Sequence, residues 1–190
     1  MIRQLIEKNR TYRRFYEDVK IENGTLEELI DLARLSSSGA NLQPLKYILS
    51  NVEDKNNVIF PHLRWAGYLK EWNGPEKGER PTGYVVMLLD KEISANCMWD
   101  HGIACQSILL GAVEKGLGGC MFGSVDRDGL RKSLDIPERY EILLVIALGK
   151  PKEEVALEDM KDPKDVKYWR DEEQVHHVPK RKLDELILNL

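Results

Sequence analysis

The sequence has few cysteines, and they are poorly spaced for disulfides or metal sites. Its three cysteines, at positions 97, 105 and 120, are odd in number and show no Cys-x-x-Cys spacing. If Cys97 and Cys105 lie on one helix, they are about 12 Å apart by helical rise, too far for a disulfide bond. We therefore expect reduced thiols in a cytoplasmic protein.

Long hydrophobic runs and an excess of positive charge are also missing. The first eight residues are charged throughout, so we expect no signal peptide. The longest apolar helix candidate, about 96–115, is interrupted by polar residues and is a poor membrane span. A formal net charge of −4 lacks the basic face that nucleic acids or anionic membranes require. The 190 residues, 42% of them hydrophobic, fit one globular domain, and we find no internal repeat.

Common catalytic motifs are absent as well. His176 and His177 are neighbours, and in an extended chain they would face opposite sides, which makes a poor metal pair. The glycines at 116–119 follow a helix instead of a strand, so they are no dinucleotide fingerprint. Cys120 has no histidine at a recognisable position and is not expected to be a nucleophile. Asp100 and His101 are expected to be polar core or interface groups.

The hydrophobic pattern predicts an α+β fold with about four or five strands that are surrounded by helices. Continuous apolar runs at 84–89 and 142–148 predict central strands that are covered on both faces. Shorter strands are expected at 47–49 and 120–122. Helices are expected at 2–9, from a capping box at Thr25 and Glu28 to about residue 35, at 97–113 and at 126–134.

Two further segments shape the expected domain, which spans 1–190. Residues 62–83 are rich in aromatics, glycine and proline, which predicts a compact cover; Trp65, Tyr68 and Trp72 either line a pocket there or pack. Residues 151–190 form a charged connector followed by a last amphipathic helix through Leu183 and Leu190. A connector this long is unusual inside a compact domain. We expect it to reach a partner subunit, and the apolar helix at 97–113 also favours a homodimer.

The most informative segments lie near the N-terminus. Residues 9–15 read Asn-Arg-Thr-Tyr-Arg-Arg-Phe, and residues 36–44 read Ser-Ser-Ser-Gly-Ala-Asn-Leu-Gln-Pro. The arginines and the hydroxyl of the first segment can hold an anion. The small residues of the second segment allow the backbone to approach a flat polar ring closely. Alternatively, the first is a solvated basic turn and the second a helix end followed by a turn.

Together with three later segments, these residues resemble the FMN-dependent nitroreductase family over nearly the whole chain. The later segments are Asp-His-Gly-Ile-Ala-Cys-Gln at 100–106, Gly-Leu-Gly-Gly-Cys-Met-Phe-Gly at 116–123 and Gly-Lys-Pro at 149–151, with a basic stretch at 180–182. The sequence departs from the family pattern at Asn9, Thr11 and Ser37. The resemblance implies a nitroreductase-like α+β fold with a mostly antiparallel central sheet, and FMN held between two subunits.

The resemblance also implies roles for individual residues. Arg10 and Thr11 would bind the FMN phosphate, with Arg181 as a second phosphate ligand and Lys180 in reserve. Arg13 would reach the polar edge of the flavin ring. The remaining expected cofactor contacts are Ser38, Gly39, Asn41, Gln43, Cys120, Met121 and Phe122. Core packing is an equally good interpretation of Met121 and Phe122.

These expectations lead to an oxidoreductase in which FMN passes two electrons from NADH or NADPH to a small acceptor. Nitroaromatics and quinones are the default acceptors by analogy. Because the cofactor carries the chemistry, no protein nucleophile or general base is needed. Three alternatives stay open: a flavin sensor or store without turnover, an enone reductase or reductive dehalogenase on the same scaffold, and a purely structural dimer.

Overall fold

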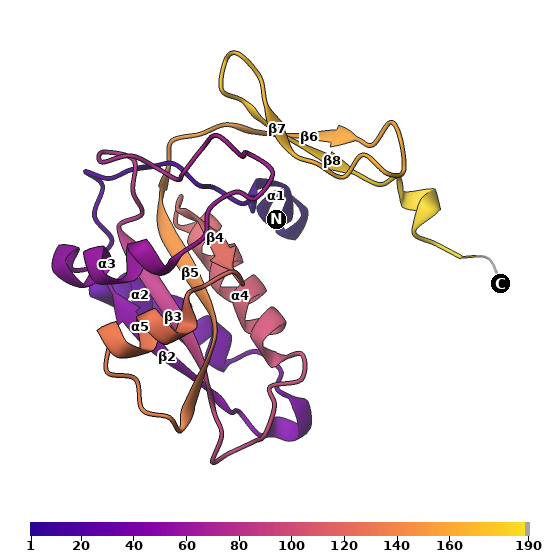
Figure 1. The fold of residues 1–190 in the computed structure, drawn as a ribbon. Helices are drawn as coiled ribbons and strands as arrows, with labels where there is room; N and C mark the ends of the chain where they lie inside the picture. The colour runs from indigo at the N-terminus through magenta and orange to yellow at the C-terminus, as the bar shows by residue number, and fades with distance from the viewer. Residues whose placement is uncertain (189–190) are drawn as a thin grey trace.

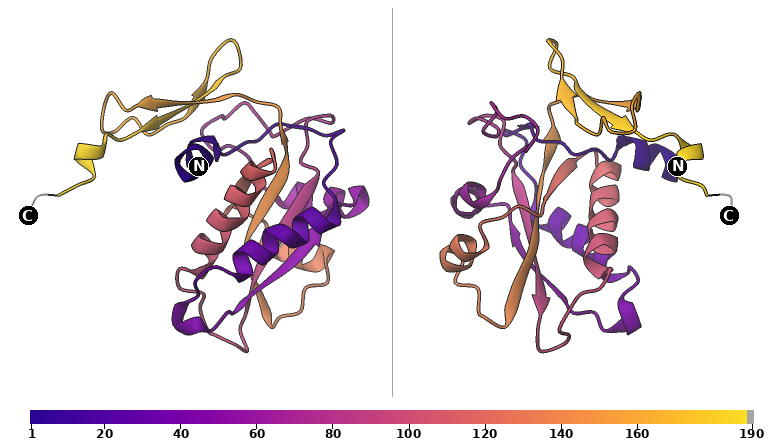
Figure 2. Two further views of the ribbon diagram at one scale, coloured as in Figure 1. Left: turned by 180° about the vertical axis from the view of Figure 1, so that it is seen from behind. Right: turned by 45° about the vertical axis from the view of Figure 1, so that its right-hand side comes forward.

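An antiparallel sheet lies between two pairs of helices in the computed structural model, which describes residues 1–188 (Figures 1 and 2). The central strand is β5 (Tyr140–Pro151). It pairs with β3 (Gly83–Asp90), and β3 pairs with the edge strand β2 (Leu45–Ser50). On its other side β5 pairs with β1 (Phe15–Tyr16) and with β4 (Gly118–Phe122). The predicted α+β fold with a mostly antiparallel sheet is confirmed.

Each face of the sheet is covered by two helices. Helices α2 (Asn23–Arg34) and α4 (Asp100–Glu114) pack on one face, where Val85 and Met87 of β3 point. Helices α3 (Glu53–Ile59) and α5 (Arg127–Ser133) cover the other, where Val86 and Leu88 point. Both faces of β3 and most of β5 are therefore buried, which is why these strands read as continuous apolar runs.

A bulge in β5 adjusts which side chains enter which layer. Met87 pairs with Leu144, but the next residue, Leu88, pairs with Ile142, so Leu143 is an extra residue. The extra residue shifts the alternation, so that Leu144 and Ile142 lie in opposite layers although they are two apart. A regular strand alternation would place Leu144 and Ile142 on the same face.

The C-terminal part forms a second, three-stranded sheet beside the helical layers (Figure 1). Strand β8 (His176–Lys180) lies in the middle, parallel to β6 (Val155–Asp159) and antiparallel to β7 (Trp169–Arg170). We call residues 152–188 the arm. The sequence predicts a charged, weakly periodic connector here, and the strands were missed because polar and charged residues interrupt their apolar ones.

Several predicted boundaries need correction. Helix α2 begins at Asn23 with Glu22 as its N-cap, two residues before the predicted capping box at Thr25. The predicted last helix is only a single 3₁₀ turn, η3 (Leu183–Glu185), and Leu190 lies outside the described residues. By contrast, α1 (Ile2–Lys8) and α5 form as expected, the latter with Asp126 accepting a hydrogen bond from the Gly129 amide at its start.

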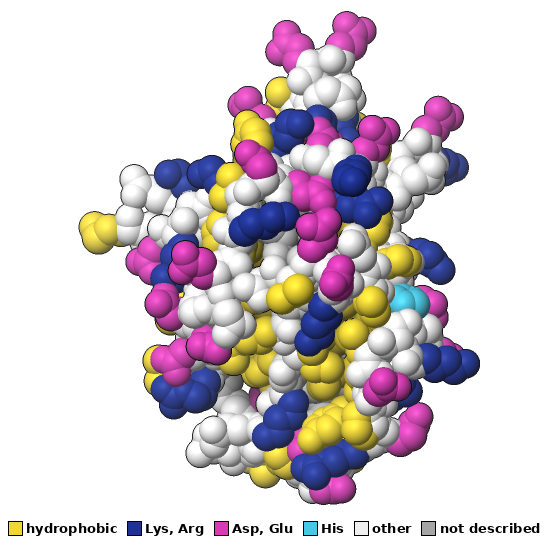
Figure 3. All heavy atoms as spheres, turned by 90° about the vertical axis from the view of Figure 1, so that its left-hand side faces the viewer, with side chains coloured by type: hydrophobic (Ala, Val, Ile, Leu, Met, Phe, Trp, Pro, Cys, Tyr) yellow, Lys and Arg dark blue, Asp and Glu magenta, His cyan; other side chains and the backbone are white. Residues whose placement is uncertain are grey.

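Two short 3₁₀ turns, η1 (Gly39–Asn41) and η2 (Phe60–His62), complete the elements. Residues 64–82, within the predicted cover, contain neither helix nor strand and pack through aromatic contacts. Over the described residues, every helix is too short or too polar to cross a membrane. Basic and acidic side chains are interspersed over the face shown in Figure 3.

The Gly119 position in β4 tests how tightly the sheet is packed. A Cβ added at Gly119 would lie 2.7 Å from the carbonyl oxygen of Ala147 and 2.8 Å from a methyl group of Leu109. We expect Gly119→Ala to lower the free energy of unfolding by about 1–3 kcal/mol, because the sheet backbone must move. Gly123→Ala, where a Cβ meets no atom within 4 Å, is the matched control. Equal denaturant midpoints for the two variants would contradict this packing.

Candidate cofactor site

Two of the predicted phosphate ligands, Arg10 and Thr11, line one cavity of about 260 Å³, which we call the N-terminal pocket. Its residues come from the chain after α1, from α4, from β4 and from the arm. The lining comprises Asn9, Arg10, Thr11, Arg13, Gln106, Leu109, Gly119, Met121, Tyr168, His176, Val178 and Lys180. Four of the eleven predicted site residues, Arg10, Thr11, Arg13 and Met121, therefore meet here.

Backbone pairing with β4 holds the first part of the pocket. Asn9 ends α1 in an extended conformation, and Thr11 then forms a parallel bridge with Gly119. The Tyr12 amide donates to the Gly119 carbonyl oxygen at 3.0 Å. Arg10 donates through Nη2 to the Ile6 carbonyl at 2.7 Å, while its buried Nε has no partner among the described residues.

Arg13 is buried against the arm. Its guanidinium carbon lies 4.6 Å from the centre of the Tyr168 ring, and its Nη1 donates to Nε2 of His176 at 3.2 Å. Burial, with the nearby charge of Arg13, lowers the pKa of His176 to about 4, so this ring is neutral. Because Nε2 accepts, the proton sits on Nδ1. That buried Nδ1 has no partner in the described part of the chain.

Strand β4 presents alternate residues to the pocket and the core. Met121 is 48% exposed and lines the pocket, whereas Cys120 and Phe122 belong to the core layer under α3 and α5. Burial raises the pKa of the Cys120 thiol to about 12, which keeps it protonated. Of the three residues expected beside the cofactor, only Met121 lines this cavity with its side chain.

The predicted serine-rich loop belongs to a different cavity of about 220 Å³, the serine-loop pocket. Ser38 and Gln43 line it, together with Arg34, Tyr47, Asp100 and others, while Gly39 and Asn41 are not among its lining residues. The loop is shaped by positive φ values of 48°, 56° and 51° at Ala40, Asn41 and Gln43. These are unusual for residues other than glycine.

Asp100 holds this loop in place. Its carboxylate accepts hydrogen bonds from Ser38 Oγ at 2.5 Å and from the Gly39 amide at 2.8 Å. Ser38 Oγ in turn accepts from the Gln43 amide at 2.9 Å. Asp100 is thus the buried anchor between the start of α4 and the loop, a specific form of the polar core role that the sequence suggested.

The two pockets lie on different sides of α4. Ala104 lines the serine-loop pocket, and Gln106 lines the N-terminal pocket. Residues two apart on an α-helix point about 200° from each other. The two cavities share no lining residue. One chain therefore does not bring the two groups of predicted residues together.

At the C-terminal side the structure selects a different basic residue from the one expected. Lys180 lines the N-terminal pocket, while Arg181 donates to the Pro163 carbonyl at 2.9 Å, outside it. Strand alternation explains this, since His176, Val178 and Lys180 share one face of β8. That period-two pattern was the available signal for the missed residues His176 and Val178. Tyr168 had no comparable signal.

The aromatic residues of the cover segment pack instead of lining the pocket. Trp65 meets Phe122 edge to face, with ring centres 4.6 Å apart, and Trp72 meets Trp65. Tyr68 lies against Tyr168 of the arm, with ring centres 4.9 Å apart. Within the described residues, no cluster of three or more side chains suits a metal ion.

This fold and site define an α+β protein with a cationic cavity at the end of its sheet, and comparisons with known proteins show which proteins it resembles. The Nitroreductase family model matches residues 85–150. An Archaeoglobus fulgidus protein named "Putative NADH dehydrogenase/NAD(P)H nitroreductase" is 27% identical over 74% of this chain and 80% of its own length. The chain is thus similar to nitroreductase-family proteins, and the resemblance seen in its motifs is confirmed.

Solved structures agree in fold. A Desulfovibrio desulfuricans structure described as a nitroreductase in complex with FMN has a TM-score of 0.71 and 22% identity, covering 100% of this chain and 96% of its own. An FMN-dependent nitroreductase from Clostridium difficile has a TM-score of 0.62 and 23% identity, covering 87% of this chain and 94% of its own.

The arm sheet that closes the N-terminal pocket depends on His177. Its Nδ1 lies 2.5 Å from Glu158 Oε1 on β6, and its Nε2 lies 3.0 Å from Asp171 Oδ2 beyond β7. The ring stacks on Trp169 at 4.2 Å. Asp171 first, and then Glu158, raise the pKa of His177 above its ordinary value.

Arm stability should therefore fall at high pH. A raised pKa in the folded arm gives stabilisation that is complete below the unfolded pKa of about 6.5 and is lost as pH rises through the folded value. Hydrogen exchange of the β6 and β8 amides, corrected for intrinsic rates, should show protection decreasing across this range. In His177→Gln the same amides should lose this dependence. An identical pH profile in both proteins would refute the role of His177.

Proposed function

We propose that this protein is an FMN-dependent oxidoreductase that transfers two electrons from NADH or NADPH to a small acceptor. Nitroaromatics and quinones are the acceptor classes that we favour. The observation that carries the proposal is the N-terminal pocket, where Arg10, Arg13 and Lys180 converge with the Thr11 hydroxyl. The family match and the names of the relatives support the same cofactor.

The pocket suits the anionic tail of FMN. Arg10 Nε and His176 Nδ1 are buried donors that lack partners in the described chain. Such donors are costly unless a ligand accepts from them, and phosphate oxygens are strong acceptors. Arg10, Thr11 and Lys180 would hold the phosphate, and Lys180 takes the place we first expected Arg181 to fill.

Bound FMN would supply the two-electron chemistry, and the protein would supply position and charge. Arg13 provides a fixed cation that is desolvated by Tyr168 and His176. A buried cation favours an anionic form of a bound group more strongly than an exposed one. His176, being neutral, accepts from Arg13 without cancelling its charge.

We further propose that two copies of the chain complete each cofactor site. The serine-loop pocket of one copy would face the N-terminal pocket of the other, which would unite the residues that one chain keeps apart. Exposed apolar side chains beside both pockets support this arrangement: Leu42, Met98, Trp99, Ile103 and Met121, with Trp99 76% exposed. Whether the arm also reaches the partner stays a prediction, because its residues already line the pocket of their own chain.

The phosphate role of Arg10 is tested by removing its side chain. Arg10→Ala should weaken FMN binding by about 1.5–3 kcal/mol, tenfold or more, because a charge-assisted contact is lost. Affinity is measured by flavin fluorescence quenching on titration of the apoprotein. Arg3→Ala, an exposed arginine on the preceding helix, is the control and should bind like the native chain. Equal affinities for the two variants would exclude Arg10 as a ligand.

Turnover is tested with the same preparation. Anaerobic NADPH or NADH should bleach the bound flavin, and a quinone should restore its colour. A flavin store would remain yellow throughout.

The dimer is tested by placing charge on α4. Trp99→Asp should shift the sedimentation coefficient from dimer to monomer and reduce FMN content, because a carboxylate would be desolvated at the interface. Val52→Asp, on an exposed residue before α3, should leave both unchanged. A Trp99→Asp protein that stays dimeric with full flavin would overturn the proposed interface.

A further inference from the structure

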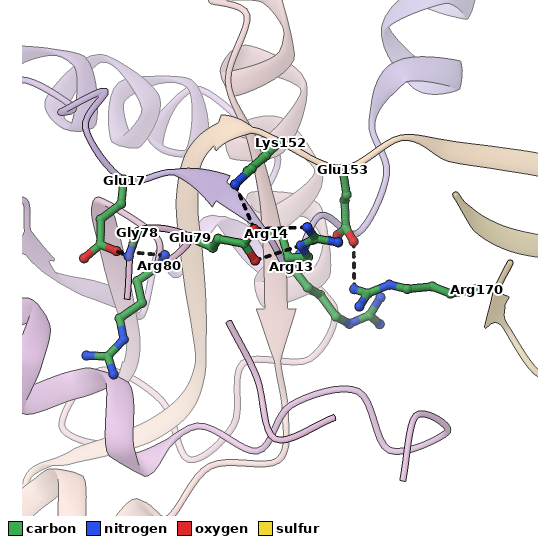
Figure 4. Close-up of polar contacts among 9 residues, drawn as sticks. All are labelled: Arg13, Arg14, Glu17, Gly78, Glu79, Arg80, Lys152, Glu153 and Arg170. Carbon is green, nitrogen blue, oxygen red and sulfur yellow. Dashed lines mark hydrogen bonds and ion pairs between the residues drawn. The ribbon is translucent and has the colours of Figure 1, made fainter. Parts of the chain in front are cut away.

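A second cationic cavity lies where the arm leaves the body of the protein. It has a volume of about 510 Å³ and is distinct from the N-terminal pocket. We call it the arm-base pocket. It is lined by Arg14, Trp72, Glu76, Lys77, Gly78, Glu79, Lys152, Arg170 and Gln174, and Figure 4 shows several of these side chains.

Two consecutive arginines line the N-terminal pocket and the arm-base pocket. Arg13 lines the N-terminal pocket, and Arg14 lines the arm-base pocket. Likewise, Tyr168 of the arm lines the first cavity and Arg170 the second. The cavities are therefore neighbours separated by one extended segment and the base of the arm. The arm-base pocket plays no part in the cofactor role proposed above.

Cations outnumber acids around the arm-base pocket. Arg14, Lys77, Lys152 and Arg170 face Glu76 and Glu79. Glu79 is already occupied: its carboxylate accepts from Arg14 Nε at 2.8 Å and Nη2 at 3.0 Å, and pairs with Lys152 at 2.8 Å. The hydrogen bond from Arg14 is the main cause that lowers its pKa to about 2. Glu79 thus fixes the positions of Arg14 and Lys152, and each of these side chains keeps further N–H donors for a ligand.

Arg170 provides the strongest sign of a ligand. Its side chain is only 9% exposed, and its Nη2 donates to Glu153 Oε2 at 2.8 Å. The guanidinium lies 4.5 Å from the centre of the Trp72 ring, which fixes its plane. Its Nε is buried and has no partner among residues 1–188. A rigid, partly unsatisfied guanidinium at a cavity is suited to an anion with several acceptor oxygens.

We propose that the arm-base pocket binds a phosphate group. The pocket offers at least four donors, which the several acceptor oxygens of a phosphate monoester can use: Arg170 Nε, the remaining Arg14 nitrogen, Lys152 and Lys77. Lys77 forms no ion pair in the described structure and is exposed at the rim. Such a group could belong to a free phosphorylated metabolite or to the 2′-phosphate of NADPH. Only the second source rests on the proposed oxidoreductase function.

The first experiment measures phosphate binding directly. The FMN-loaded protein is titrated calorimetrically with inorganic phosphate, and with 2′,5′-ADP, at constant ionic strength. Lys77→Gln should weaken phosphate binding about tenfold, because one charge-assisted donor is lost. Lys91→Gln, at an exposed lysine outside the cavity, is the matched control. Lack of saturable binding to the native protein, or equal affinities for both variants, would overturn the site.

A second comparison separates the two cavities and the two sources. Arg10→Ala alters the N-terminal pocket, so it should leave phosphate affinity unchanged; a parallel loss would assign the binding to that pocket and refute the proposal. If Lys77→Gln lowers kcat/KM for NADPH but not NADH, the phosphate belongs to the dinucleotide. If Lys77→Gln leaves kcat/KM unchanged for both NADPH and NADH while phosphate binding weakens, the ligand is a free phosphorylated molecule. Should the protein carry no FMN, the titrations with phosphate still decide the matter.

Discussion

A single buried carboxylate connects the parts of this molecule that matter for ligand binding. Glu153 lies two residues after the central strand β5, and its side chain is fully buried; its Oε1 accepts from the Arg13 amide and its Oε2 from Arg170 at 2.8 Å. It thereby fixes the N-terminal segment and the arm to the same point. A buried carboxylate needs such partners, because unpaired it would be strongly destabilising. The positions of both cationic cavities follow from this contact.

Much of the fold could be predicted because its signals are local. The apolar runs of β3 and β5 and the Asp126 cap of α5 are features of a few adjacent residues. The arm sheet could not be predicted in this way. Its strands contain charged and polar residues, and they are held by pairing with one another and by distant contacts such as Arg170 with Glu153. The predicted last helix did not form over residues 183–188, where Leu183, Leu186 and Ile187 are exposed and so do not pack on the described part of the chain.

The residues of the candidate site likewise fall into those with a local sequence signal and those without one. Arg10, Thr11, Arg13 and Met121 were found because their motif is contiguous, and the structure places them in one cavity. Tyr168 and His176 were missed because only the folded arm brings them beside Arg13. The resemblance assigned Ser38 and the arginines to one cofactor held between two subunits, and within one chain they line separate cavities. The motifs therefore indicate which kind of ligand to expect, whereas only the folded chain shows which residues lie together around it.

The adjacent positions of Arg13 and Arg14 have a consequence for how this segment can change. Each guanidinium reaches a different cavity because neighbouring residues of an extended chain point to opposite sides. Inserting one amino acid between Arg13 and Arg14 would place both guanidiniums on the same side of the chain, so that one of the two cavities would lose its arginine. The two cavities therefore require that these arginines stay directly adjacent.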